Sequence, residues 1–155
     1  MTQRSLIRTR LSALALLPAL VAGCASLPGG SVSESRAQRL LDAGEPERAA
    51  TVYLELAGLA EGGERDRLLL RAARAFTAAG DASRAGVAIN RVAEPRAADR
   101  VTDWLVARAA LANLQDNGVE SLALLDEVDM RGVTLNQRID LEGERGTALF
   151  LTGQP

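Results

Sequence analysis

The stretch AARAFTAAGDASRAGVAI, residues 72–89, decides the fold. A small residue, Ala73, is followed three positions later by Phe76, which lets two helices approach closely at one point and interlock at the next. Gly80 marks a turn, and the carboxylate of Asp81 suits the N-cap of a following helix. After the turn, small Ala85 and then bulky residues at helical spacing form one apolar helix face. This stretch therefore predicts a helical hairpin.

The same arrangement recurs about every 36 residues, with turns around Gly44, Gly80, Asp116 and Gly153. A fixed period in this range indicates a solenoid of repeated units. Side-chain size follows the period as well as the turns do. The small-then-larger pairs before the turns are Ala37 and Leu40, Ala73 and Phe76, and Gly146 and Leu149, whereas the pair Ala109 and Ala112 fills the larger position poorly. The sets after them are Ala49, Tyr53 and Leu56; Ala85, Ile89 and Val92; and Ser121, Leu125 and Val128.

The pattern predicts an all-α chain of three to three-and-a-half helical hairpins over residues 34–155. The first helices of the hairpins are expected near 34–43, 64–79, 97–114 and 135–151, and the second helices near 46–60, 82–93 and 119–128. Breaks between hairpins are expected at 62–63, 94–95 and 131–132, where glycine or proline occurs. The alternative is a plain antiparallel helical bundle. Because the last expected helix has no second helix after it, we also expect the chain to be truncated at its C-terminus.

These units resemble the tetratricopeptide repeat. That family places a small residue eighth, an aromatic residue or Leu eleventh, Gly fifteenth, Ala twentieth and a bulky residue twenty-fourth in each unit. Ala73, Phe76, Gly80, Ala85 and Ile89 match all five positions. The unit around Asp116 matches less well, and the spacing is slightly longer than the usual ~34 residues. The resemblance implies a tetratricopeptide-like (TPR-like) solenoid.

The N-terminus has the layout of a secretory signal peptide over residues 1–23. Arg4, Arg8 and Arg10 precede an apolar run over 11–22, which small residues follow. The run is shorter than the ~20 residues that a membrane-spanning helix needs.

Val21-Ala22-Gly23-Cys24 resembles the lipobox of bacterial lipoproteins. In that family the peptide is cut before the cysteine, here between Gly23 and Cys24, and the cysteine and its new amino group carry acyl chains such as palmitate. Several acyl chains give lasting anchorage to a membrane. An Asp directly after the cysteine would resemble an inner-membrane retention signal. Because Ala25 stands there instead, we expect the protein on the periplasmic face of the outer membrane. Residues 24–33 then form a lipidated, flexible tether, whereas the alternative leaves Cys24 as an ordinary residue of an ordinary signal.

The composition argues against catalysis. The chain has no His, a single Cys and only Arg among its 18 basic residues, which removes His-based triads and metal sites, CxxC sites and Walker-type phosphate binding. Glu142 and Glu144 do not share a helix face and so do not form a glycosidase pair. Cleavage leaves 132 residues with 15 Arg against 20 acidic residues, a net charge of −5, which argues against nucleic acid as a partner. We expect no catalytic residue, metal, cofactor or small-molecule substrate.

The lipobox, the short tether and the repeats, in that order, resemble the penicillin-binding protein activators among outer-membrane lipoproteins (the LpoA type). The strings DRLLLRAA (66–73), AGD (79–81) and ALFLTGQP (148–155) support the resemblance. It implies a regulator of peptidoglycan synthesis, and hence of cell shape, that stimulates a class A penicillin-binding protein through protein–protein contact. In that family a second domain, like a periplasmic solute-binding protein, follows the repeats and makes the activating contact, so this chain corresponds to the N-terminal anchor and spacer part. The alternative is another TPR-type outer-membrane lipoprotein that acts as a scaffold for envelope or pilus assembly.

Tetratricopeptide repeats bind partners on the concave face that their first helices line. Carrying that face over by position predicts five partner-binding residues, namely Arg67, Arg74, Asp103, Asn113 and Asp140. Arg67 and Arg74 are expected to pair with acidic groups of a partner, and the alternative is a solvated helix face. Trp104 and Tyr53 are interpreted as packing residues.

Overall fold

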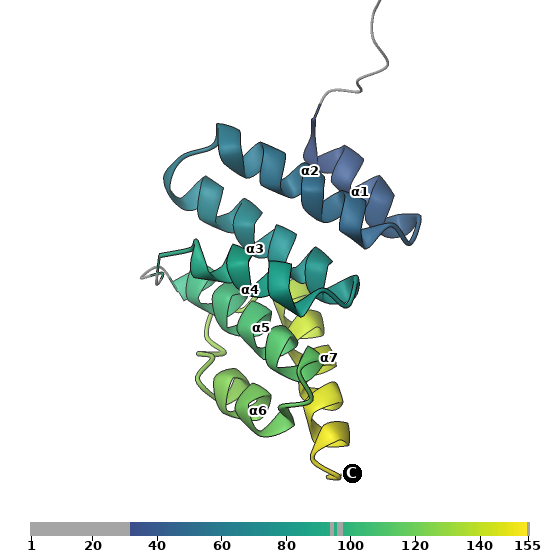
Figure 1. Cartoon of the computed structure of the whole chain (residues 1–155). Coiled ribbons are helices and arrows are strands. Elements are labelled where there is room, and N and C mark those ends of the chain that lie inside the picture. Colours follow the sequence, from purple (N-terminus) through teal and green to yellow (C-terminus); the bar gives the residue numbers. More distant parts are fainter. Residues whose placement is uncertain (1–31, 94, 96–97, 155) are drawn as a thin grey trace, which may run out of the picture. The chain divides into compact units, whose positions relative to one another are not determined.

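The computed structural model describes residues 32–93, 95 and 98–154, and every regular element in these ranges is an α-helix (Figure 1). The helices are α1 (Glu34–Asp42), α2 (Pro46–Leu59), α3 (Gly62–Ala78), α4 (Ala82–Asn90), α5 (Ala98–Leu114), α6 (Gly118–Asp126) and α7 (Leu135–Leu151). The all-α prediction is therefore confirmed. The predicted signal peptide, the Gly23–Cys24 cleavage site and the tether up to residue 31 lie outside the described residues.

Side chains from the local sequence cap the starts of α1, α4, α6 and α7. Asp81, the predicted N-cap, accepts a hydrogen bond from the backbone N–H of Arg84 at 2.8 Å, and Pro46 occupies the first turn of α2. Thr134 and Gln137 form a reciprocal capping box at the start of α7. The predicted bounds differ by a few residues: α3 begins at Gly62 instead of 64, and α4 and α6 end earlier than expected.

The four predicted turns share one backbone geometry. Gly44, Gly80, Asp116 and Gly153 all have left-handed φ angles, between 59° and 76°. In each turn, the N–H of the next residue donates to a carbonyl five residues before it: Leu40, Phe76, Ala112 and Leu149 accept at 2.8–2.9 Å. This is the Schellman arrangement, which favours glycine or an Asx residue at the left-handed position. The period in the sequence is thus a period in backbone conformation.

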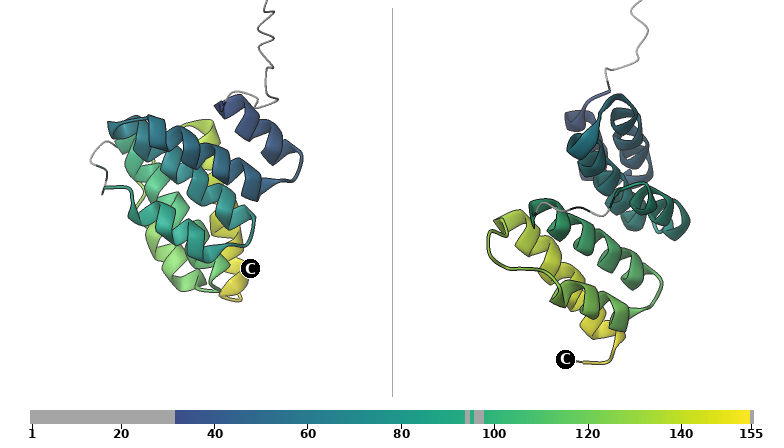
Figure 2. Two further views of the ribbon diagram at one scale, coloured as in Figure 1. Left: turned by 45° about the horizontal axis from the view of Figure 1, so that its top comes forward. Right: turned by 90° about the vertical axis from the view of Figure 1, so that its left-hand side faces the viewer.

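Helices that follow one another in the chain pack side by side, from α1 against α2 through to α6 against α7 (Figure 2). The first helices of successive hairpins also touch, since α3 packs on α5 and α5 on α7. Ion pairs from Glu34 to Arg67 and Arg71 link α1 to α3 in the same way. The helices α1, α3, α5 and α7 therefore form a continuous row.

The predicted small residues at the helix contacts are buried, with one exception. Ala37, Ala73 and Ala109 are fully buried, as are Ala49, Ala85 and Ser121 after the turns. The prediction for Gly146 is wrong: it is exposed, and a Cβ placed there would meet nothing within 4 Å. The reason is that α7 packs against α5 and α6 with its other side, through Leu141 and Ala148.

The apolar core forms two clusters. The larger joins α1–α4 with Ala107 of α5 and contains the buried rings of Tyr53 and Phe76. The smaller joins α5, α6 and α7 around Leu105, Leu125 and Leu141. Trp104 is half-buried and packs against both clusters. Tyr53 and Trp104 therefore lie in packing positions, as we interpret them from the sequence.

Candidate functional site

A cavity of about 880 Å³ opens along the row of first helices. Side chains of α1, α3, α5 and α7 line it, together with Tyr53 of α2 and the segment before α7. Its size falls in the range of ligand-binding clefts. We call it the groove, and its two charged sides the α3 wall and the α5/α7 wall.

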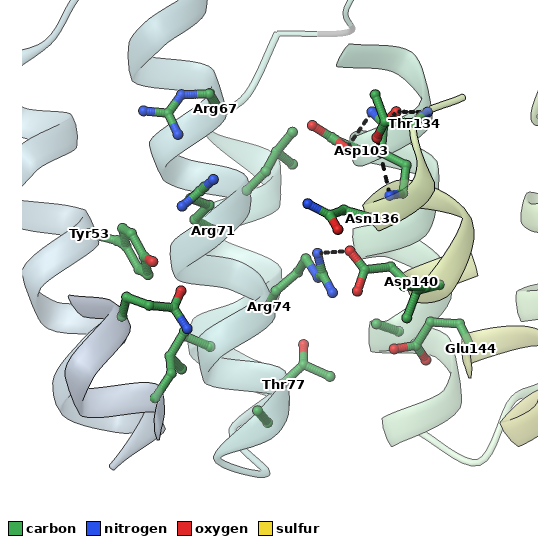
Figure 3. A pocket seen from close by; sticks show the side chains of 18 of the residues that line it. Tyr53, Arg67, Arg71, Arg74, Thr77, Asp103, Thr134, Asn136, Asp140 and Glu144 are labelled. Carbon is green, nitrogen blue, oxygen red and sulfur yellow. Dashed lines mark hydrogen bonds and ion pairs between the residues drawn. The ribbon is translucent and has the colours of Figure 1, made fainter. Parts of the chain in front are cut away.

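The α3 wall carries three arginines, Arg67, Arg71 and Arg74, at i, i+4 and i+7 on one helix face (Figure 3). Arg67 forms two-pronged hydrogen bonds with Glu64 and with Glu34. These bonds, first to Glu64 and then to Glu34, raise the pKa of Arg67. The hydrogen bond from Arg67 is also the main cause of the lowered pKa of Glu34.

Arg71 lies between Arg67 and Arg74 on the α3 wall. One of its nitrogens lies 3.1 Å from the Glu34 carboxylate, and its guanidinium stands over the Tyr53 ring at 5.9 Å from the centroid. A cation over an aromatic face is attracted by the ring quadrupole. The aromatic ring and the carboxylate together hold Arg71 at the edge of the groove.

The α5/α7 wall carries three carboxylates, those of Asp103, Asp140 and Glu144. Asp103 accepts a hydrogen bond from Nε2 of Gln137 at 2.9 Å, so the capping box at the start of α7 also positions α5. The Asn113 amide donates to the Glu144 carboxylate and to the Glu144 backbone carbonyl, both at 2.9 Å. Neutral amides therefore hold two of these carboxylates in place.

One ion pair crosses the groove from wall to wall. Arg74 Nη1 donates to Asp140 Oδ2 at 2.6 Å, and Figure 3 shows the two side chains meeting between α3 and α7. The side chains are 41% and 31% exposed, so water screens the pair. Desolvation opposes the charge of Arg74, but the hydrogen bond with Asp140 and the negative charges of Asp140, Glu144 and Asp103 outweigh it and raise its pKa. All three carboxylates thus act on one guanidinium.

The structure brings four of the five predicted partner-binding residues together. Arg67, Arg74, Asp103 and Asp140 all line the groove. Asn113 does not line it, but is buried behind the α5/α7 wall and holds Glu144. Arg67 and Arg74, expected to pair with a partner, are already ion-paired within the chain.

Sequence reasoning missed Arg71, Glu144 and Glu34 as parts of this site. Helical spacing could have found the first two, because Arg71 is four residues after Arg67 and Glu144 is four after Asp140. No local signal could have found Glu34, which meets Arg67 only through the packing of α1 beside α3.

The groove offers charged and hydrogen-bonding groups for recognition. In the described ranges, no group of three or more His, Cys, Asp or Glu side chains is placed to hold a metal ion. Within the same ranges, no helix has the length and apolar character needed to cross a membrane.

Comparison with protein-family models, with curated proteins and with solved structures finds no match.

Proposed function

We propose that this chain is a lipid-anchored outer-membrane protein built as a TPR-like solenoid, which regulates peptidoglycan synthesis by binding a class A penicillin-binding protein. It acts without catalysing a reaction of its own. The proposal combines the resemblance of the sequence to penicillin-binding protein activators with the groove on the row of first helices.

The repeated turns support the TPR-like part of this proposal. Four turns at a spacing of 36 to 37 residues have the same left-handed position and the same hydrogen bonds. A plain helical bundle does not require its turns to be equivalent, whereas a stack of repeated hairpins does.

The groove is the observation that carries the proposed protein contact. It runs across all four first helices, from Gln38 of α1 to Glu144 of α7, so every hairpin contributes to one surface. Solenoid proteins use such continuous concave surfaces to bind other proteins.

Capture of a purified class A penicillin-binding protein by the chain beginning at Cys24 tests the function. Immobilised chain should retain the enzyme. Retention of envelope-assembly or pilus proteins without the enzyme would instead favour the scaffold alternative. Release of peptidoglycan fragments by the purified chain alone would contradict the non-catalytic assignment.

A pair of groove variants locates the contact. Arg67→Glu with Arg74→Glu should change capture, but each change also sets a new carboxylate beside the present ones. Arg67→Gln with Arg74→Gln removes the charges without this repulsion and should change capture while circular dichroism stays unchanged. Arg48→Gln with Arg131→Gln is the matched control, because both arginines are ion-paired outside the groove. Equal capture by all these variants would place the contact elsewhere.

The lipid anchor has its own test. In a Gram-negative host, the full chain should incorporate labelled palmitate and fractionate with the outer membrane. Cys24→Ala should abolish labelling and membrane fractionation together. Palmitate labelling of the Cys24→Ala chain would contradict the lipobox.

A further inference from the structure

The two walls of the groove carry unequal charge. On and beside the α3 wall, Arg67 and Arg71 are matched by Glu34 and Glu64. Across the groove, Arg74 forms an ion pair with Asp140 at 2.6 Å. The groove itself is lined by three guanidiniums and three carboxylates, but Glu34 and Glu64 beside it neutralise Arg67 and Arg71, which leaves Asp103 and Glu144 in excess.

That excess lies on the α5/α7 wall. Asp103 and Glu144 accept hydrogen bonds from the neutral amides of Gln137 and Asn113. Among the described residues, neither carboxylate has an arginine nitrogen within ion-pair distance. Both side chains are half-buried and line the groove, so a cation that binds there is partly shielded from water.

The buried amide of Asn113 fixes part of this wall. Asn113 is 7% exposed, and its Nδ2 is committed to the carboxylate and the backbone carbonyl of Glu144. Its Oδ1 is buried without a hydrogen-bond partner in the described part of the chain. Leaving that oxygen unpaired lowers the stability of the fold, so positioning the Glu144 carboxylate through this amide has a cost in the free energy of unfolding.

The charge around the wall adds to its local excess. Residues 34–93 contain nine acidic residues and nine arginines, whereas residues 98–154 contain ten acidic residues and five arginines. The whole negative charge of the helical region is therefore carried by the part that includes the α5/α7 wall. Such a field draws positively charged segments toward the groove.

We propose that the groove binds a basic segment of a protein partner, with its arginine or lysine side chains placed against Asp103, Asp140 and Glu144. The inference rests on the proposed function in taking the groove as the contact surface for a protein, and it adds the chemistry of that partner. Gln137, beside Asp103, and Glu144 are seven residues apart on α7, about 10 Å along the helix. The segment therefore presents at least two basic side chains within that span.

Fluorescence anisotropy with a labelled peptide of alternating Arg and Ala tests the inference on the chain beginning at Cys24. The Arg–Ala peptide should bind, and its affinity should fall as salt is raised, whereas a Glu–Ala peptide of equal length should not bind. Asp103→Asn with Glu144→Gln should weaken binding of the Arg–Ala peptide about tenfold. Both replacements keep an oxygen that can accept the bonds from Gln137 and Asn113, so the fold should be retained.

Asp116→Asn with Glu127→Gln is the matched control. These two exposed residues belong to the same acidic part of the chain but do not line the groove, and removing them changes the net charge by the same amount. An equal loss of affinity in the control, no binding of the Arg–Ala peptide, or tighter binding of the Glu–Ala peptide would overturn the inference. If the double groove variant fails to fold, the single variants Asp103→Asn and Glu144→Gln carry the same comparison.

The failure of this inference and that of the proposed function are distinguishable. Capture of a class A penicillin-binding protein that Asp103→Asn with Glu144→Gln leaves unchanged would refute the basic segment and keep the proposed function. Binding of the Arg–Ala peptide in the groove without capture of that enzyme would refute the proposed function and keep the basic groove ligand.

Discussion

The helices α1–α4, which we call the first half, and α5–α7, the second half, are built on similar hairpins but differ inside. Every buried residue of the first half is apolar in character, from the alanines at the helix contacts to Tyr53 and Phe76. In the second half, Thr102, Asn113 and Ser121 are buried as well. The buried side-chain atoms that lack a hydrogen-bond partner among the described residues, in Asn113, Ser121 and Arg145, all belong to the second half.

The half with the buried polar groups is also the half with the carboxylates of the α5/α7 wall. Each unpaired buried polar atom costs about 1–3 kcal/mol of folding free energy. This cost lowers the stability of the second half but not that of the first half. The same half supplies the carboxylates of the α5/α7 wall and the amide that holds Glu144. Among the described residues, the cost of unpaired buried polar atoms therefore falls on the half that holds the carboxylates of the proposed binding surface.

Removing the Phe76 ring should have the largest effect on the first half. Phe76 is fully buried, and the guanidinium of Arg84 covers its ring at 4.7 Å from the centroid. Phe76→Ala should lower the free energy of unfolding by about 3–5 kcal/mol, because a cavity replaces the ring. Urea unfolding followed by circular dichroism measures the loss.

Phe150 is the matched control, since the chain has only two phenylalanines and this one is 83% exposed on α7. Phe150→Ala should change stability by no more than about 0.5 kcal/mol. A loss comparable to that of Phe76→Ala would mean that the outer face of α7 is covered in solution.

Two glycine substitutions in the second half should act in opposite directions. A Cβ on Gly118 would lie 2.7 Å from the Ala148 carbonyl and 3.0 Å from Cβ of Leu151, so Gly118→Ala should cost about 1–3 kcal/mol by overpacking α6 against α7. A Cβ on Gly143 meets nothing within 4 Å. Gly143→Ala, inside α7, should therefore raise stability by roughly 0.5–1 kcal/mol.

Thermal unfolding of the two alanine variants checks the pair. If both were destabilised, the side of α7 that carries Gly143 would have to be packed. If both were neutral, α6 and α7 would have to be less closely packed than the distances at Gly118 indicate.

The fold could be read from the sequence wherever backbone geometry restricts the residue type. Left-handed turns favour glycine or Asx residues, and close helix contacts admit only small ones, so Gly44, Gly80 and Asp116 located the turns and Ala37, Ala73 and Ala109 the contacts. The prediction for Gly146 was wrong because the sequence does not distinguish a glycine on an open helix face from a glycine at a helix contact.

The groove was only partly predictable, for a related reason. Positions on one helix face follow from spacing, which placed Arg67 and Arg74 on the same wall. Ion pairs between distant helices do not follow from spacing, because any of several carboxylates could have met each arginine. Glu34 with Arg67, 33 residues apart, and Asp140 with Arg74, 66 residues apart, needed the packed structure.

Replacing Ser121 should repair part of the second half. Ser121 is fully buried, its Oγ has no hydrogen-bond partner among the described residues, and the equivalent positions of the earlier hairpins hold Ala49 and Ala85. Ser121→Ala should raise the free energy of unfolding by about 1 kcal/mol, since it removes an unpaired polar group without opening a large cavity. Destabilisation would instead indicate a buried water bound to the hydroxyl.

The smallest expected effect distinguishes the first half by its response to pH. Glu34 is 39% exposed, and its hydrogen bond with Arg67 lowers its pKa below the ordinary value of 4.5 in the folded protein. A carboxyl group with a lowered folded-state pKa stabilises the fold above its unfolded pKa, and this contribution is lost as the pH falls from 4.5 through the folded-state pKa. Glu34→Gln should therefore cost at most about 1 kcal/mol at neutral pH, because the ion pair is partly exposed and water screens it. The original chain and the variant should converge in stability as the pH falls below 4.5, as measured by urea unfolding at each pH. A difference that persists in strong acid would mean that Glu34 acts through packing and not through its charge.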